Sequence, residues 1–336
     1  MAVRGYLGRY GSDIGIVEGQ PGALSVRPGP AAVNPNYLAL SPDGQVVYAA
    51  LRDDAGNQVG AYAVDGDGLR PLGAQPSGGN DVCHLSVDAS GRYVLSAHYG
   101  HSGPGVVAVH PIAADGSLEE RCDLVEHSGS GPHDRQAGAH PHMVVTDPTG
   151  KYVLVVDLGA DTVFRYELVD GRLRSAGTAT VPAGAGSRHL AFHPGQTYAY
   201  VANELDSTVS VLNLSTFEVE ATLSTVTPDW DAPSWPSAIR VSADGQFCYI
   251  ANRGPETIAV LAISDDGATL RLVDAVPCGG DTPRDLVLAG DHLYVANQRS
   301  DAVTQFAVDV STGIPRALDA PIATPAPTSL VFADHR

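Results

Sequence analysis

The sequence predicts an all-β fold, a seven-bladed β-propeller, on the basis of a repeat and of its composition. An apolar strand with a Gly-containing turn before it recurs along the chain. The copies read SPDGQVVYAA at residue 41, DASGRYVLSA at 88, DPTGKYVLVV at 147, HPGQTYAYVA at 193, SADGQFCYIA at 242 and a shortened AGDHLYVA at 289. The 336 residues include 37 glycines and 24 prolines, which supply the many turns that short strands require.

Each copy continues with a polar stretch and two more strand-like runs, so we expect four antiparallel strands in each unit. Six units run over residues 34–73, 81–120, 139–177, 186–224, 235–276 and 282–321. The seventh is composite, because PTSLVFAD at 327–334 reads as its first strand and the N-terminal RGYLGRYGSDIGIVEGQPGALSV as the other three. A shared terminal blade closes the ring and leaves no open sheet edge. We therefore expect one domain over residues 1–336, and not an immunoglobulin-like sandwich, which has no long repeat.

Charge and cysteine usage limit the partners. The formal net charge of −18 opposes binding to nucleic acid or to an anionic membrane, although a few focused arginines can still bind a small anionic substrate. No apolar leader or run of about 18 apolar residues is evident, so we expect a cytoplasmic protein. The four cysteines form no CxxC pair and are expected to be free thiols. Acidity discourages self-association, which favours a monomer or weak oligomer.

Aligning the units predicts where a site lies. In a propeller the first strand of each blade is innermost, so its entry and the exit from the second strand meet at one face around the channel. The entry positions are Asn36, Cys83, His142, Arg188, Ser237, Arg284 and Thr328. The exit positions include His98, Asp157 and Asn203, with Tyr99, Glu204, Arg253 and Gln298 among the residues that follow the exits. From unit to unit, the side chains at these aligned entry and exit positions vary among cationic, anionic and amide types, which indicates a ligand site. The alternative is that the asparagines only cap strand ends.

Two insertions lengthen loops that enter first strands, at residues 126–142 and 227–235. The first is rich in histidine and contains His127, His133, His140 and His142, with Gln136. A zinc or copper site is conceivable there, but no Asp or Glu stands at a familiar spacing, and we predict no metal site. The second contains Trp230 and Trp235, which either cover a substrate or pack the loop. No phosphate-binding loop or G-x-S-x-G nucleophile motif is present, and no cofactor is indicated.

The segments CHLSVDASGRYVLSA, GPHDRQAGAHPHMVVTDPTGKYVLVVDLGAD, GSRHLAFHPGQTYAYVANELDSTV and SADGQFCYIANRGPETIAV together resemble the lactonase family of seven-bladed propellers. That family includes 6-phosphogluconolactonases and carboxy-cis,cis-muconate lactonising enzymes, and the resemblance spans nearly the whole chain. It implies that the proposed active-site His, Arg and Glu are His140, Arg188 and Glu204, with a further arginine at Arg253. The chain departs from the family pattern at His98-Tyr99, where Asn-Tyr is expected, at Ser187-Arg188-His189 for Pro-Arg-His, and at Gly8-Arg9-Tyr10 for Gly-Thr-Tyr.

The resemblance implies opening of a sugar-type lactone similar to 6-phosphogluconolactone. Either Glu204 or His140 would be the general base, Arg188 would stabilise the oxyanion, and Arg253 with Arg284 would hold an anionic group. The remaining predicted substrate-binding residues are His98, Gln136, His142, Asp157, Asn203 and Gln298. Two alternatives stay open: a cyclase or isomerase that acts on an unsaturated carboxylic acid, and a propeller that only binds a protein partner.

Overall fold

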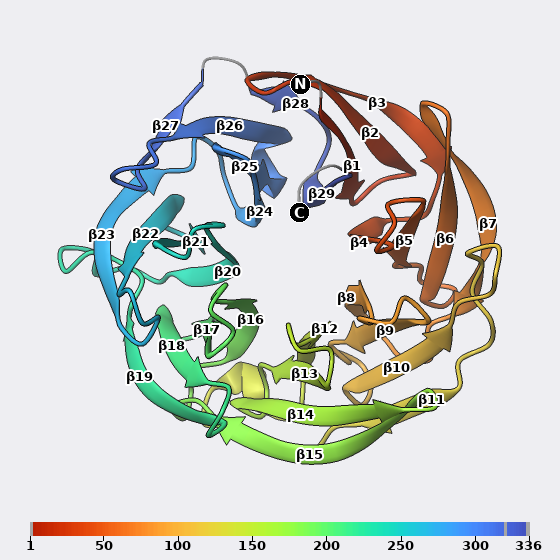
Figure 1. Ribbon diagram of the computed structural model, residues 1–336, viewed down its shortest axis with the longest axis horizontal. Helices are drawn as coiled ribbons and strands as arrows, with labels where there is room; N and C mark the ends of the chain where they lie inside the picture. Colours follow the sequence, from red (N-terminus) through yellow and green to blue (C-terminus); the bar gives the residue numbers. More distant parts are fainter. Residues whose placement is uncertain (1–2, 319–320, 334–336) are drawn as a thin grey trace.

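Seven β-sheets surround a central axis in the computed structural model, which describes residues 3–318 and 321–333 (Figure 1). The only helical turns in these residues are two 3-10 turns, η1 (Asp134–Gln136) and η2 (Gln298–Ser300). The prediction of an all-β, seven-bladed propeller with antiparallel blades is confirmed.

One blade joins the two ends of the chain, as the sequence predicted. Its strands, from the channel outwards, are β29 (Pro327–Phe332), β1 (Val3–Arg9), β2 (Asp13–Gln20) and β3 (Ala23–Ala31). β29 pairs antiparallel with β1, with Leu330 opposite Leu7. The ring is therefore closed by hydrogen bonds between the first and last strands.

The other six blades follow chain order from the innermost strand outwards. The first two comprise β4 (Pro35–Leu40), β5 (Val46–Leu51), β6 (Gln58–Asp65) and β7 (Gly68–Pro76), then β8 (Val82–Val87), β9 (Tyr93–His98), β10 (Val106–Pro111) and β11 (Asp123–Glu126). The next two comprise β12 (Pro141–Thr146), β13 (Tyr152–Asp157), β14 (Thr162–Val169) and β15 (Arg172–Thr180), then β16 (Ser187–Phe192), β17 (Tyr198–Asn203), β18 (Thr208–Asn213) and β19 (Glu218–Ser224). The last two comprise β20 (Trp235–Val241), β21 (Phe247–Arg253), β22 (Thr257–Ile263) and β23 (Leu270–Pro277), then β24 (Pro283–Ala289), β25 (His292–Asn297), β26 (Ala302–Val308) and β27 (Pro315–Ala317), with the short β28 (Ile322–Ala323) also on β26.

The predicted unit ends lie within about three residues of the outer strands except in one unit, and in a second unit the outer strand is divided. The unit predicted to end at residue 120 continues to the outer strand β11, which ends at Glu126. The intervening Glu119, Glu120 and Arg121 are exposed, and this stretch makes only an isolated bridge between Ile112 and Leu118. The unit predicted to end at residue 321 has its outer strand divided into β27 and β28.

The core consists of apolar layers between neighbouring blades. Each layer combines the facing sides of two adjacent sheets; one, for example, joins Leu154 and Val156 of β13 to Leu190 of β16. A fully buried aliphatic side chain contributes roughly 1.5–3 kcal/mol, so each blade is stabilised chiefly by its two neighbours. The centre of the ring is left to polar side chains.

A β-bulge near the start of each innermost strand aims one or two residues at the channel. In every blade the pairing register shifts at this point, and the skipped residue is the predicted entry position. These residues are Asn36, Cys83, His142, Arg188, Ser237, Arg284 and Thr328. Four of the seven strands begin with proline, which is tolerated at the first residue of a strand because no ladder N–H is needed there. The bulges explain why the entry position of these largely apolar strands carries a polar residue or cysteine.

Removal of β29 should destabilise the propeller, because this strand closes the ring. A chain that ends after Ala326 lacks β29, which exposes the edge of β1 and removes Leu330 from the core layer. We expect this chain to lose cooperative thermal unfolding and to aggregate, as measured by circular dichroism and light scattering. A chain that ends after Ala333 keeps β29 and is the control, with the full-length Tm expected; equal cooperativity in the two chains would contradict closure by β29.

Candidate active site

A cavity of about 890 Å³ opens at the bulged end of the innermost strands. Six of the predicted site residues line it: His140, His142, Arg188, Glu204, Arg253 and Arg284. They come from β12, β16, β21, β24 and the segments next to these strands. The structure therefore brings together most of the residues that the alignment of repeats singled out.

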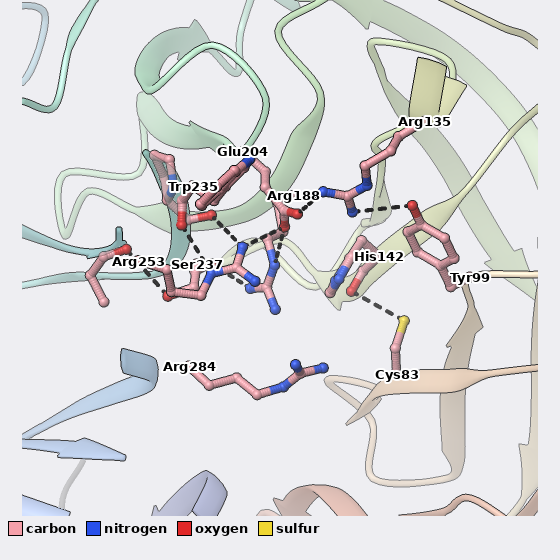
Figure 2. Close-up of polar contacts among 12 residues, drawn as sticks. Cys83, Tyr99, Arg135, His142, Arg188, Glu204, Trp235, Ser237, Arg253 and Arg284 are labelled. Carbon is pink, nitrogen blue, oxygen red and sulfur yellow. Dashed lines mark hydrogen bonds and ion pairs between the residues drawn. The ribbon is translucent and has the colours of Figure 1, made fainter. Parts of the chain in front are cut away.

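The Glu204 carboxylate lies at the centre of an arginine cluster (Figure 2). Its Oε2 is 2.8 Å from Arg188 Nε and 2.8 Å from Arg253 Nη2, and its Oε1 is 2.5 Å from Arg135 Nη1. The side chain of Glu204 is only 3% exposed. Both carboxylate oxygens are thus occupied by guanidinium groups, which leaves Glu204 poorly placed to accept a proton from water.

Backbone carbonyls fix two of these arginines. Arg188 donates from Nη1 to the carbonyl of Ser237, and Arg253 donates from Nε to the carbonyl of Trp235 at 3.0 Å. Both acceptors lie in β20, directly after the predicted insertion 227–235. In the described part of the chain, no hydrogen bond joins Arg188 Nη2 or Arg253 Nη1 to another protein group, so their N–H groups remain for a ligand. Trp235 therefore contributes its backbone here, and neither it nor Trp230 lines the cavity.

The charges in the cluster depend on one another. Burial alone would raise the pKa of Glu204, but the three guanidinium charges outweigh burial and hold that pKa well below its usual range. Burial lowers the pKa of Arg188, and the charge of Arg253 lowers it further, while Glu204 opposes both effects. Glu204 consequently stays ionised and helps to keep Arg188 charged inside the protein.

His140 lies on the cavity wall with one ring nitrogen committed to the backbone. Its Nδ1 is 2.6 Å from the Tyr99 carbonyl, and the two rings stack with centroids 4.2 Å apart. Because a carbonyl can only accept, Nδ1 carries the proton, and the neutral ring has its lone pair on Nε2. The backbone N–H of His140 donates to Asp157 Oδ1 at 2.7 Å. A Cβ on Gly159 would meet the Gly138 carbonyl at 1.8 Å, so only glycine lets this loop approach.

Tyr99 and Arg135 belong to the site but were absent from the predicted set. Arg135 Nη2 donates to the Tyr99 hydroxyl at 3.2 Å, so this pair connects Glu204 to the ring that stacks on His140 (Figure 2). Arg135 lies in η1, inside the predicted His-rich insertion, and Gln136 anchors that turn. Tyr99 directly follows His98 in the predicted exit column, and that position was its only signal.

Four residues predicted to bind substrate do not line the cavity, which corrects their expected placement. His98 Nδ1 lies 3.2 Å from the Val106 carbonyl, and Asn203 donates to Thr208 and Ser210. Gln136 donates to Leu158 and Asp161, and Asp157 pairs with His127 at 2.9 Å. His98, Asp157 and Asn203 end second strands, where side chains alternate in direction. The exit residue points into the blade, and the next residue, such as Tyr99 or Glu204, faces the cavity.

The last predicted contact, Gln298, also lies outside the cavity lining but acts on a residue within it. Its Oε1 accepts a hydrogen bond from Arg284 Nη1 at 3.2 Å. The guanidinium of Arg284 lies 5.5 Å from the centre of the Tyr10 ring. Gln298 therefore holds Arg284 in place.

Buried aromatic rings cluster next to His142 in the channel. The ring of His189 is 5.3 Å from His142 and 5.4 Å from His84, and His84 is 4.2 Å from Tyr37. Burial lowers the pKa of His84 to about 3 and holds the pKa values of His142 and His189 well below 6.5. These imidazoles are neutral at physiological pH.

The described residues contain no group of three or more His, Cys, Asp or Glu side chains suited to hold a metal ion. The histidines of the insertion separate: His127 pairs with Asp157, His133 caps η1, and His140 and His142 face the cavity. All four cysteines are free thiols. No described helix is long and apolar enough to cross a membrane.

The family model described as "Lactonase, 7-bladed beta-propeller" matches residues 18–332. The chain belongs to this lactonase family. It is 36% identical to the 6-phosphogluconolactonase of Bacillus subtilis over 304 residues, which cover 88% of this chain and 86% of that protein.

Two solved structures of similar proteins share the fold of this lactonase over nearly the whole length. The periplasmic gluconolactonase PpgL of Pseudomonas aeruginosa superposes with a TM-score of 0.93 at 28% identity and covers 100% of both chains. A putative 6-phosphogluconolactonase from Bacteroides fragilis has a TM-score of 0.90 at 27% identity, with 99% of this chain and 98% of that chain covered. The resemblance predicted from the sequence is confirmed.

The buried histidines predict how stability depends on pH. Their pKa values are lowered in the folded state, so between pH 6.5 and those values the unfolded chain binds more protons and stability falls as the pH is lowered. Each contributes a slope of up to about 1.4 kcal/mol per pH unit. Urea unfolding of His189→Gln between about pH 6 and pH 5 should therefore give a slope smaller by roughly that amount. The exposed control His101→Gln should keep the wild-type slope, and an unchanged slope in His189→Gln would contradict the burial of a neutral imidazole.

Proposed function

We propose that the protein hydrolyses a sugar-type lactone and that 6-phosphogluconolactone, or a close analogue, is its substrate. The names of the relatives support a sugar lactone, and they do not favour the cyclase or protein-binding alternatives. The observation that carries the chemistry is the pairing of His140, whose Nε2 is free, with an arginine cluster in one cavity.

In the proposed reaction His140 is the general base. Its Nε2 takes a proton from a water molecule as the water oxygen forms a bond to the lactone carbonyl carbon. The carbonyl oxygen gains negative charge, and the N–H groups of Arg188 and Arg253 that remain for a ligand donate to it. When the tetrahedral intermediate collapses, the bond from carbon to the ring oxygen breaks. The departing oxygen then receives the proton from the His140 imidazolium and becomes a hydroxyl group. The carboxylic acid formed at the same time keeps the second proton of the water and releases it to solvent as it ionises to the carboxylate.

Glu204 orients the arginines in this proposal and is not the base. Its Oε1 accepts an N–H from Arg135, its Oε2 lies 2.8 Å from nitrogens of Arg188 and Arg253, and its lowered pKa makes it a weak proton acceptor. Asp157 and Tyr99 are positioning residues for His140, since they hold its backbone N–H and its Nδ1. Of Glu204 and His140, the two candidate general bases predicted from the sequence, this arrangement favours His140.

We also propose that the enzyme acts in the cytoplasm as a monomer or weak oligomer. Four free thiols favour a reducing compartment, and a net charge of −18 opposes self-association. Measurement of its mass in solution and cell fractionation test this proposal.

Substitution of the base tests the proposal directly. His140→Gln replaces the imidazole with an amide that cannot accept the proton from water, so kcat/KM should fall at least about 100-fold. Arg188→Lys loses the planar fork that donates to the oxyanion, and a fall of similar size is expected. The assay follows acid release from phosphorylated and plain sugar lactones, with spontaneous ring opening subtracted.

His101→Gln is the matched control, because His101 lines the same cavity and its ring lies near the same Tyr99, with centroids 6.5 Å apart. Its kcat/KM should stay within about threefold of wild type. Near-wild-type turnover in both His140→Gln and Arg188→Lys would contradict the mechanism. Absence of hydrolysis of every lactone by the wild-type enzyme would contradict the function.

A further inference from the structure

The cavity holds more positive than negative charge in its interior, although the protein as a whole is strongly acidic. Arg135, Arg188 and Arg253 share the single carboxylate of Glu204. Arg284 has no carboxylate partner among the described residues, and it donates a hydrogen bond to the neutral Gln298. Four guanidinium groups therefore face one carboxylate.

The other charges at the cavity do not cancel this excess. Arg52 is already paired with Asp81, so the two contribute no net charge. Glu126, Asp134 and Arg135 line the cavity but are exposed, where water screens their charge. Without these three side chains, Arg188, Arg253 and Arg284 still face the single carboxylate of Glu204. By contrast, the side chains of Arg188 and Glu204 are only 3% exposed, and interactions there are screened much less.

The excess charge is divided between two places. One lies at the Glu204 cluster, where Arg188 Nη2 and Arg253 Nη1 remain for a ligand and the proposed reaction creates a carboxylate. The other is Arg284, on β24, whose guanidinium projects into the cavity from a different blade (Figure 2). The two are close enough for the Arg284 charge to lower the pKa of Arg188. A guanidinium binds a carboxylate or phosphate through parallel N–H bonds, so each place suits one anionic group.

We propose that the cavity binds a ligand with two anionic ends, and that this ligand is the ring-opened product of the phosphorylated lactone. Hydrolysis turns the lactone carbonyl into a carboxylate at the Glu204 cluster while the phosphate stays on Arg284. The product therefore matches the excess charge better than the substrate does, and the enzyme is inhibited by it. This inference rests on the proposed function for the identity of the ligand.

Equilibrium binding to the wild-type protein tests the proposal. Isothermal titration calorimetry at pH 7.5 compares 6-phosphogluconate with gluconate, glucose 6-phosphate and inorganic phosphate. 6-Phosphogluconate carries both a carboxylate and a phosphate, whereas each of the other three compounds carries only one anionic group. We expect 6-phosphogluconate to bind at least about tenfold more tightly than any of the other three, the scale of one additional charge-assisted hydrogen-bond pair. Equal affinity for 6-phosphogluconate and either gluconate or inorganic phosphate would overturn the proposal.

Two arginine variants identify the phosphate site. Arg284→Gln should weaken 6-phosphogluconate binding at least about tenfold and leave gluconate binding within about twofold of wild type. Arg52→Gln is the matched control, since this arginine also lines the cavity but is neutralised by Asp81, and a change below about twofold is expected. Equal losses in the two variants would overturn the role of Arg284.

Kinetics with the wild-type enzyme separate this proposal from the function on which it rests. Lactone hydrolysis without inhibition by 6-phosphogluconate overturns the inference and leaves the lactonase function intact. Tight binding of 6-phosphogluconate without hydrolysis of its lactone overturns the function and supports the two anion sites.

Discussion

One buried carboxylate organises the site. Glu204 binds guanidinium groups from β16, from the end of β21 and from the turn η1, three parts of the chain that are far apart in sequence. Without that anion, the positive charges of Arg188 and Arg253 would repel each other in a place that water screens poorly. The cavity is therefore cationic and ordered at the same time, and the proposed oxyanion and product contacts both depend on this order.

The propeller makes such a cluster possible because its core and its site use different parts of each blade. Apolar layers between blades set the spacing of the sheets, and they continue around the ring through the closing strand β29. A bulge at each inner strand then aims polar residues at the axis without disturbing those layers. The residue at the entry position, such as Arg188 or Arg284, can consequently differ from blade to blade while the strands stay alike.

The repeat was sufficient to predict the fold, the closing blade and five of the six predicted residues that line the cavity, because the strand pattern and the blade geometry are both local. The sixth, His140, came from the resemblance to the lactonase family. It misplaced His98, Asp157 and Asn203, since an alignment marks the end of a strand but not the direction of its last side chain. Arg135 was missed because its contact with Glu204 spans 69 residues and depends on how a loop folds, which no period encodes. The outer strand β11 was displaced for a similar reason, namely an irregular, charged connection.

The central claim is that Glu204 is a permanently charged anchor and not the group that accepts a proton during catalysis. Infrared spectroscopy tests this most directly, through the carboxylate band that is present in the wild-type enzyme and absent from Glu204→Gln. Because its pKa is held well below the usual range, the band should persist unchanged as the pH falls from about 8 to about 4, across any loss of activity. Loss of this band above about pH 5, in step with the loss of activity, would show that the carboxylate becomes protonated there. That result would contradict the claim and assign the base to Glu204.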